Sequence, residues 1–290
     1  VAAGSVTYDS LGRPLVKTDA LGRTTSTAYT PAATQPLLST AETNTAPFSW
    51  TTTTTFEPTT GTKAQIVDPN GATTTIAVDA LGRTSSVWLP LRPQAANPSS
   101  PSLAFTYTLS HTAPNAIKTD TVTGGGVVTK YELFDGLGRP TQTQSAAVGG
   151  GAVIKTTNYD HQGRVYFVDN DYWTASITPG TAFFTPTTEN NIPSQVVTSY
   201  DAVGRALTST LNTTGTVHSQ TVTAYLGADR VDTVPPAGGT STSTFTNSLG
   251  QKTKLVQYLS PGITGAGQAT TFAYDGGGRM TRMTDPAGND

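Results

Sequence analysis

The sequence predicts an all-β protein, a strip of short antiparallel β-hairpins with little or no helix. Two observations predict this class. About one residue in five is Thr, and Val and aromatic residues are frequent as well, which is the side-chain chemistry that favours strands. A five-residue motif, Asp-x-x-Gly-Arg, also recurs along the chain, and its most closely spaced copies begin 10 residues apart. That interval holds one strand of about six residues and one tight turn, which leaves no room for helices.

The composition excludes several classes of protein. Charged residues make up 12% of the 290 residues and the formal net charge is -2, so the chain has no basic surplus with which to neutralise nucleic-acid phosphates. Cys is absent, which removes disulfides, thiolate chemistry and Cys-ligated zinc. No apolar run is long enough for a membrane helix. Because the first residue is Val1, we expect the chain to be an internal piece of a longer protein.

The Asp-x-x-Gly-Arg motif is present in seven complete copies, which hold seven of the ten Arg residues. Three degenerate copies keep the acid or amide and the glycine, at Asp68 to Gly71, Asn247 to Gly250 and Asp285 to Gly288. The residues of the complete copies, which we expect to form structural turns, are Asp9, Gly12, Arg13, Asp19, Gly22, Arg23, Asp79, Gly82, Arg83, Asp135, Gly138, Arg139, Asp160, Gly163, Arg164, Asp201, Gly204, Arg205, Asp275, Gly278 and Arg279.

Each motif is predicted to close a β-hairpin. An aromatic or β-branched residue precedes most copies, as Tyr8 and Tyr159 do, so a strand runs into the turn. The Asp carboxylate can accept the backbone N–H two residues on, and the Gly stands where a positive φ is needed. We therefore expect a type I turn with a glycine bulge. We also expect Val at Gly204 to be less well tolerated than Val at a loop glycine such as Gly149.

Segments rich in Pro, Gly and Ser interrupt the array near residues 31–47, 90–102, 174–193, 235–243 and 260–267. They are predicted to be long hairpin loops rather than interdomain linkers, because the same motif resumes on both sides of each. No shift in composition marks a domain boundary. Residues 1–290 are therefore predicted to form one continuous array, a segment of a longer structure.

No catalytic, cofactor-binding or metal-binding residue is assigned. His111, His161 and His218 lie 50 and 57 residues apart without acidic neighbours at metal-ligand spacing, so we expect them to face solvent. Only four Glu are present and most of the 15 Asp are explained by turns, which disfavours the paired carboxylates of a glycoside hydrolase.

Two further sets of residues could be read as binding sites, one for calcium and one for a sugar. Asp169-Asn170-Asp171 lacks the acidic residue that would complete a calcium loop, and we expect a polar loop there. Trp50 and the pair Tyr172-Trp173 offer rings on which a sugar could stack, although packing against the sheet is the favoured interpretation.

Three copies of the motif resemble a known repeat. The segments Tyr159 to Arg164, Tyr200 to Arg205 and Tyr274 to Arg279 resemble the Tyr-Asp-x-x-Gly-Arg core of the RHS, or YD, repeat. Phe56 to Gly61 followed by Asp68 to Gly71 is similar to its longer consensus. The resemblance extends over essentially the whole chain. It implies a β-sheet strip that spirals into a large hollow shell, as in bacterial polymorphic toxins, insecticidal toxin complexes and teneurin-type surface proteins.

The resemblance implies a non-catalytic structural region of a secreted or cell-surface bacterial protein, part of a shell that encapsulates a C-terminal toxin cargo. The expected partners are the rest of its own polypeptide and the enclosed cargo domain, with no cofactor, no nucleic acid and no transmembrane segment in this piece. The alternative is an adhesin or wall-associated surface protein that binds glycans or another cell. A glycan hydrolase on a β scaffold is less favoured.

Overall fold

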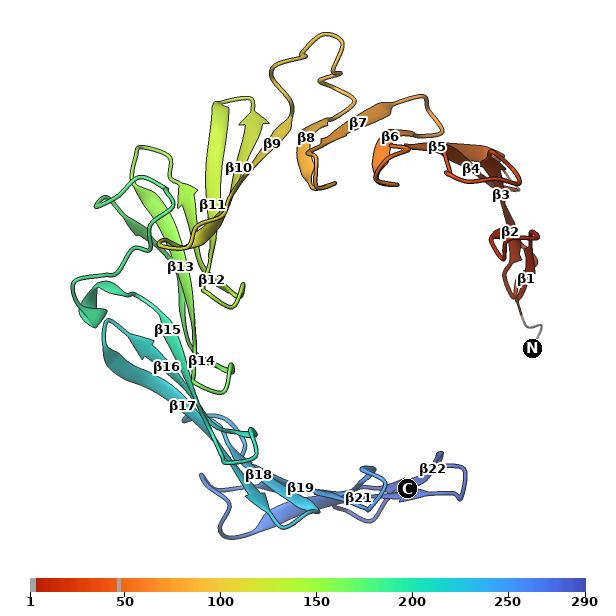
Figure 1. The fold of residues 1–290 in the computed structure, drawn as a ribbon. Coiled ribbons are helices and arrows are strands. Elements are labelled where there is room, and N and C mark those ends of the chain that lie inside the picture. Colours follow the sequence, from red (N-terminus) through yellow and green to blue (C-terminus); the bar gives the residue numbers. More distant parts are fainter. Residues whose placement is uncertain (1–3, 46–47) are drawn as a thin grey trace. The chain divides into compact units, whose positions relative to one another are not determined.

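The computed structural model describes residues 4–45 and 48–290. It confirms the all-β prediction: the described residues form 22 strands and a single 3-10 turn, η1 (Glu189–Asn191). The chain divides into two compact units, Val1–Glu132 and Leu133–Asp290. Figure 1 follows the strands along the chain.

The first unit contains ten strands and the start of an eleventh, β11, which ends in the second unit. They are β1 (Ser5–Tyr8), β2 (Pro14–Thr18), β3 (Thr24–Thr30), β4 (Ser39–Asn44), β5 (Trp50–Phe56), β6 (Lys63–Val67), β7 (Thr73–Val78), β8 (Thr84–Trp88), β9 (Leu103–Thr108), β10 (Asn115–Thr123) and β11 (Gly126–Phe134).

The second unit continues with β12 (Pro140–Ala146), β13 (Ala152–Tyr159), β14 (Val165–Thr174), β15 (Gln195–Tyr200), β16 (Ala206–Thr213), β17 (Thr216–Leu226), β18 (Arg230–Val234), β19 (Thr242–Thr246), β20 (Lys252–Tyr258), β21 (Gly267–Tyr274) and β22 (Met280–Thr284).

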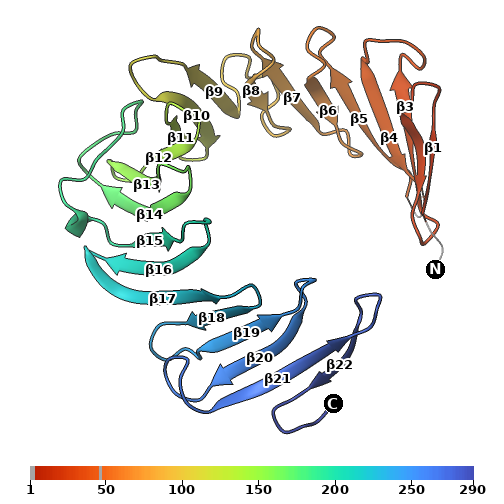
Figure 2. The same ribbon diagram turned by 60° about the horizontal axis from the view of Figure 1, so that its bottom comes forward.

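Each unit is an antiparallel meander. Consecutive strands pair from β1 to β10 in the first unit and from β12 to β22 in the second. Figure 2 shows neighbouring strands side by side within each unit. Because every connection is local, the order of the strands in each sheet repeats their order in the sequence.

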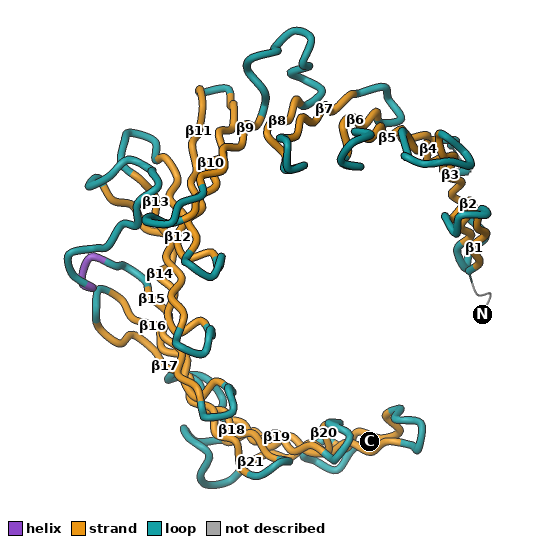
Figure 3. The backbone as a smooth tube through the Cα atoms, viewed as in Figure 1, coloured by secondary structure: helices purple, strands orange, loops and turns teal. Residues whose placement is uncertain are grey.

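Successive connections of a meander lie at opposite ends of its strands. We call the end where odd-numbered strands run into even-numbered ones the turn edge, and the other end the loop edge. Of the complete motifs, all but the one at Asp19 lie at the turn edge. The long connections 89–102, 175–194, 235–241 and 259–266 lie at the loop edge, and Figure 3 distinguishes these loops from the strands.

One of the expected loops is partly strand. The interval 31–47 was predicted to be irregular, but Ser39–Asn44 forms β4 and pairs with both β3 and β5. Thr40 and Thr43 favour a strand, but so short an element between Pro residues gives only a weak signal in the sequence. Residues 46–47 of that interval lie outside the described residues.

The long loops cover two of the few buried apolar sites. Ala152, Ile154 and Tyr172 of β13 and β14 are buried, and Ile177 and Phe184 of the loop 175–194 pack against them. Trp88, at the end of β8, is buried as well and donates its indole N–H to the Asn97 carbonyl of the loop 89–102, at 2.7 Å. Each of these loops thus folds back over its own sheet and shields a small apolar patch.

Two buried glutamines fix the loop 175–194 to the sheet. The Gln144 amide donates to the Ala182 carbonyl at 2.7 Å and accepts from the Gly180 N–H at 2.9 Å. Gln142 does the same at Phe184, with both distances 2.8 Å. A side-chain amide has the same donor and acceptor as a peptide group, so these two residues of β12 pair with the loop much as a strand would.

Candidate functional site

The repeated turn is the most regular chemical arrangement in the molecule, and the turn at Asp160 represents it. One carboxylate oxygen of Asp160 accepts the N–H groups of Gln162 and Arg164, both at 2.9 Å. The other accepts the Arg164 Nε–H at 2.7 Å. The Gly163 N–H donates to the Asp160 carbonyl and Gly163 has φ of 83°. A type I turn followed by a left-handed glycine is the geometry that this sequence pattern predicts.

All seven complete motifs share this geometry. In each, the Asp carboxylate accepts N–H groups two and four residues on and the Arg Nε–H. The motif glycines have φ between 75° and 90°. The turn therefore holds its Arg side chain in one direction, as well as reversing the chain.

Five of these Arg residues lie over a tyrosine ring of the next odd-numbered strand. The pairs are Arg13 with Tyr29, Arg83 with Tyr107, Arg139 with Tyr159, Arg164 with Tyr200 and Arg205 with Tyr225, and Cζ lies 4.1 to 4.5 Å from the ring centroid. A cation over an aromatic face at this distance is stabilising, by about 0.5–1 kcal/mol where exposed. We call each such set of Asp, Arg and Tyr a clamp.

The tyrosine hydroxyl adds a second link in four of the clamps. It donates to the carbonyl of the residue that follows the Arg: Tyr29 to Pro14, Tyr107 to Thr84, Tyr159 to Pro140 and Tyr200 to Val165, at 2.6 to 2.9 Å. Tyr274 donates in the same way to Lys252, next to the degenerate turn at Asn247. The ring and the hydroxyl thus link the end of an odd-numbered strand to the turn that precedes the neighbouring even-numbered strand.

In the second unit the clamps form a continuous series. Tyr159 covers Arg139 and is followed by Asp160, which holds Arg164. Arg164 in turn lies under Tyr200, which is followed by Asp201. Consecutive turns along the turn edge are therefore linked to one another. This link was not predicted from the sequence, although the aromatic residue before several motifs was its visible signal.

The environment of the turn keeps the Asp ionised. Burial alone would raise the pKa of Asp160, but hydrogen bonds from the N–H groups of Arg164 and Gln162 and from the Arg164 guanidinium outweigh burial and lower that pKa. The pKa of the Asp in each of the other six motifs is lowered as well. A carboxylate whose charged form accepts this many hydrogen bonds is a poor proton donor or acceptor near neutral pH.

One turn within residues 4–45 and 48–290 is a neutral version of the motif. Asn247 accepts the N–H groups of Leu249 and Gln251, both at 3.0 Å, and its amide donates to the Gln251 side chain at 2.8 Å. The turn geometry therefore requires an acceptor at the first position rather than a charge.

One polar cluster away from the turns was not predicted from the sequence. The buried Asp232 accepts two hydrogen bonds from the Arg230 guanidinium, at 2.8 and 2.9 Å, and one from the Ser243 hydroxyl. The Tyr258 hydroxyl lies 2.9 Å from Ser243. The only signal was that Arg230 and Asp232 are two apart, which places both side chains on the same face of a strand. Because the guanidinium neutralises Asp232, this cluster is an ion pair that ties β18 to β19 and β20.

The other residues singled out in the sequence do not converge. His111, His161 and His218 are exposed and lie in a loop, a turn and β17. Within residues 4–45 and 48–290, no three His, Asp or Glu side chains lie close enough together to hold a metal ion. In the same described part, no helix is long and apolar enough to span a membrane.

The expectation of a polar loop at residues 169–171 is wrong. These residues lie within β14, and Asp169 is buried and accepts a hydrogen bond from Gln195 at 2.8 Å. The loop 175–194 covers this part of the sheet, which is why a residue that reads as turn-forming in the sequence is enclosed.

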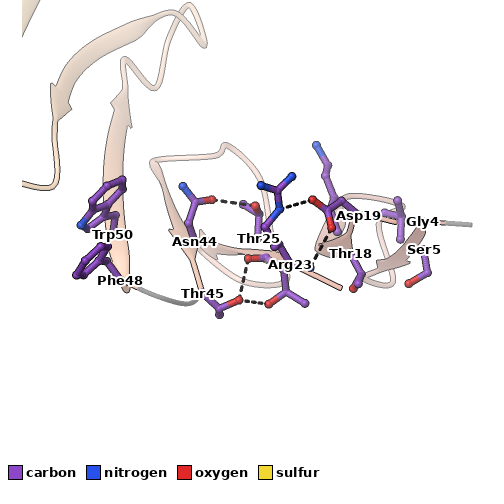
Figure 4. Close-up of a pocket in the computed structure, with 13 residues that line it drawn as sticks. Gly4, Ser5, Thr18, Asp19, Arg23, Thr25, Asn44, Thr45, Phe48 and Trp50 are labelled. Carbon is purple, nitrogen blue, oxygen red and sulfur yellow. Dashed lines mark hydrogen bonds and ion pairs between the residues drawn. The ribbon is translucent and has the colours of Figure 1, made fainter. Parts of the chain in front are cut away.

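Trp50 lies at a pocket of about 670 Å³ in the first unit. Its ring stacks on that of Phe48, with centroids 5.4 Å apart and planes 8° apart, and both rings are more than half exposed. Asn44 and Arg23 line the same pocket, and Figure 4 shows Asn44 bonded to Thr25 and Arg23 bonded to Asp19. Trp173 is also exposed but lies in β14, with its indole N–H bonded to the Gly150 carbonyl.

We predict that the two glycines of one turn respond differently to Ala. Gly138 has φ of 75° whereas Gly136 is outside the left-handed region, and a Cβ at either position would meet no atom within 4 Å. Gly138→Ala should therefore destabilise the fold by about 1–2 kcal/mol through backbone strain alone. Gly136→Ala should be neutral or stabilise slightly.

Urea unfolding of the two variants beside the parent chain measures the difference, and an equal loss at both positions would show that φ is not what the turn requires. The contrast expected at Gly149 is wrong, because Gly149 also has a positive φ, of 87°.

We also predict that the fold is sensitive to acid. The pKa of each motif Asp is lower in the folded chain than the roughly 3.9 of an unfolded Asp. The resulting stabilisation is complete above about pH 5 and is lost as the pH falls through the folded pKa values. The free energy of unfolding should therefore be flat near neutral pH and decline below about pH 4.

The Asp19 turn tests the source of this slope, because among the described residues no ring covers Arg23. Replacing Asp19 by Asn and Arg23 by Gln reproduces the neutral Asn247 turn, so the dependence of unfolding free energy on pH between about 2 and 4 should become shallower. An unchanged slope would mean that the depressed Asp pKa values are not its origin.

Comparison with known proteins bears on the last hairpin. Residues 262–290 match the family model of the RHS repeat. They contain β21, the Asp275 turn, β22 and the degenerate turn at Asp285. A search of curated proteins finds no match. The matched segment includes Tyr274 to Arg279, one of the motifs on which the resemblance was based, and residues 262–290 are therefore identified as an RHS repeat.

Proposed function

We propose that this chain is a non-catalytic wall segment of a secreted or cell-surface bacterial protein, part of a shell that encloses a C-terminal toxin cargo. The observation that carries the proposal is the clamp, repeated along the turn edge of both units. An arrangement that recurs at successive turns with the same partners fits a structural role, because a catalytic site is one distinct arrangement of residues.

The sheets have large surfaces with little burial of their own. The chain exposes 17391 Å², whereas two compact domains that each hold half of this mass would together expose roughly 14,000 Å². The side chains of β7 and β15 illustrate the pattern, since most are partly rather than fully buried. Such a layer serves to separate two spaces, and its stability depends on pairing between strands more than on a central core.

The wall is also chemically neutral over much of its area. More than half of the strands contain no Asp, Glu, Lys or Arg: β1, β3, β5, β7, β8, β9, β12, β15, β16, β17, β19 and β21. A surface on which Thr and Ser predominate and charges are few has no strong electrostatic field. It would hold a cargo by enclosure rather than by a tight interface.

The test uses the complete polypeptide that contains this chain. We predict that a protease leaves its C-terminal segment intact, and that Gly163→Val combined with Gly204→Val, which strains two consecutive clamped turns, exposes that segment to cleavage. Gly136→Ala is the matched control and should retain protection. Equal digestion of the C-terminal segment in the parent and in the double variant would contradict encapsulation.

Adhesion through a glycan is the second candidate function, and the pocket at Trp50 is the observation that favours it. Stacked exposed rings beside amide and hydroxyl groups offer a flat apolar face with polar groups at its border, which is suited to a sugar ring.

We predict that binding of the chain to a glycan array is abolished by Trp50→Ala and unaffected by Trp173→Ala. The second substitution removes an exposed Trp outside the pocket. Loss of binding in both variants, or binding by neither the parent nor the variants, would exclude the pocket as a glycan site.

A further inference from the structure

A row of polar side chains crosses the sheet of the second unit from β12 to β16. The register places its five members opposite one another in successive strands: Gln142, Thr156, Asp169, Gln195 and Asn212. Opposite residues of an antiparallel pair share one face of the sheet. Hydrogen bonds connect members of the row, since the Gln142 amide donates to Thr156 at 3.1 Å and the Gln195 amide donates to Asp169 at 2.8 Å. The row is therefore a fixed line of polar groups.

The first three members of this row line a pocket under the loop 175–194. Its volume is about 300 Å³, and residues 183–186 of the loop line it together with Gln142, Thr156 and Asp169 of the sheet. Sites for small molecules have volumes of about 300–1,000 Å³. All the lining residues belong to the second unit. We call this space the Asp169 pocket.

Three phenylalanine rings line the Asp169 pocket. Phe167 belongs to β14, and Phe183 and Phe184 belong to the loop. Phe183 is 42% exposed, so part of its ring is accessible from solvent. The backbone of Phe184 is held by the Gln142 amide, which positions this part of the loop before any ligand arrives. A preorganised site loses less entropy on binding than a flexible one.

The charge of the pocket has one source. Asp169, which is 3% exposed, is the only ionisable residue among the described residues that line the pocket, and the other polar groups there are amides and hydroxyls. Charges attract one another more strongly where water is scarce. The face of a phenylalanine ring also carries negative partial charge. Both features favour a cation over an anion.

We propose that the Asp169 pocket binds an organic ammonium ion, either a small methylated or alkyl amine or the ammonium group of a Lys side chain. The carboxylate supplies the opposite charge, and the aromatic rings contact the carbon atoms around the nitrogen, which is how aromatic sites recognise ammonium groups. A calcium ion fits less well, because it requires six or more oxygen ligands. A neutral sugar would gain no ionic attraction from Asp169.

The pocket at Trp50 lacks this combination. Its acid, Asp19, is paired with Arg23 at 2.6 Å, and Lys17 lines the same pocket. An ammonium ion there would meet two other cations. The Trp50 pocket therefore offers exposed aromatic rings without the charge that the proposal requires, and it serves as an internal control.

Calorimetric titration of the 290-residue chain with tetramethylammonium chloride and with butylammonium chloride is the first measurement. At least one of these ions should bind about tenfold more tightly than tert-butanol or glucose, which are neutral. Tighter binding of tetramethylammonium would indicate a free methylated amine, and tighter binding of butylammonium would indicate a Lys side chain. Either result supports the proposal, whereas no binding of either ion, or equally tight binding of tert-butanol or glucose, would overturn it.

Two variants test the two parts of the site. Asp169→Asn removes the charge but keeps an oxygen that can accept from Gln195, and it should weaken ammonium binding at least about tenfold. Phe183→Leu keeps an apolar side chain but removes the aromatic face, and it should weaken ammonium binding about two- to fivefold. Trp50→Ala is the matched control and should bind as the parent does.

Urea unfolding of each variant beside the parent checks that the fold is retained. Because Phe183 is exposed, Phe183→Leu remains an independent test if Asp169→Asn proves to be unstable. Unchanged ammonium affinity in either pocket variant that is folded, or a loss of affinity in Trp50→Ala, would contradict the assignment of the site.

Discussion

The carboxylate of the motif Asp is the group on which the rest of this structure depends. By accepting two backbone N–H groups and one Arg Nε–H, as Asp160 does, it fixes both the reversal of the chain and the direction of the Arg. Without that direction the guanidinium would have no fixed position over the next tyrosine. A local turn thereby determines a contact with a strand that is 20 or more residues away in several of the clamps, as with Arg205 and Tyr225.

The clamps compensate for the absence of a large core. A sheet with few buried side chains gains little from apolar burial, so its neighbouring hairpins need other links. Arg over Tyr provides one such link, and the tyrosine hydroxyl provides another in Tyr29, Tyr107, Tyr159 and Tyr200. Both lie at the turn edge, where hairpins would otherwise separate most easily. The wall function that we propose requires such an edge, since a barrier fails where adjacent hairpins part.

The loop edge is stabilised in a different way. There the long connections fold back over the sheet and are held by polar side chains, as Gln144 holds the loop 175–194 through the Gly180 and Ala182 backbone. The small apolar cluster of Ala152, Ile154 and Tyr172 lies beneath that loop. The two edges thus combine a uniform repeated link with individual loop contacts, which leaves the loops free to differ in length and sequence.

The sequence by itself determined the fold class and the turns. Strand propensity and the spacing of Asp-x-x-Gly-Arg are local properties, and a meander is built from local pairings, so the order of strands followed as well. Even the positive φ of Gly163 could be expected from its place in the turn. The strand β4 was not predicted, because six residues between Pro-rich segments give too weak a local signal.

Only the tertiary structure decided which side chains meet across strands. Arg164 and Tyr200 are brought together by the register of β14 and β15 across an intervening loop of 20 residues, 175–194, and no property of either residue alone reveals the contact. The burial of Asp169 and Gln144 likewise depends on how that loop folds over the sheet. Polar residues of types that are common in turns and on surfaces therefore lie in the interior. Turns are fixed by interactions within a few residues of sequence, whereas clamps and loop contacts are fixed by pairing and docking over longer distances.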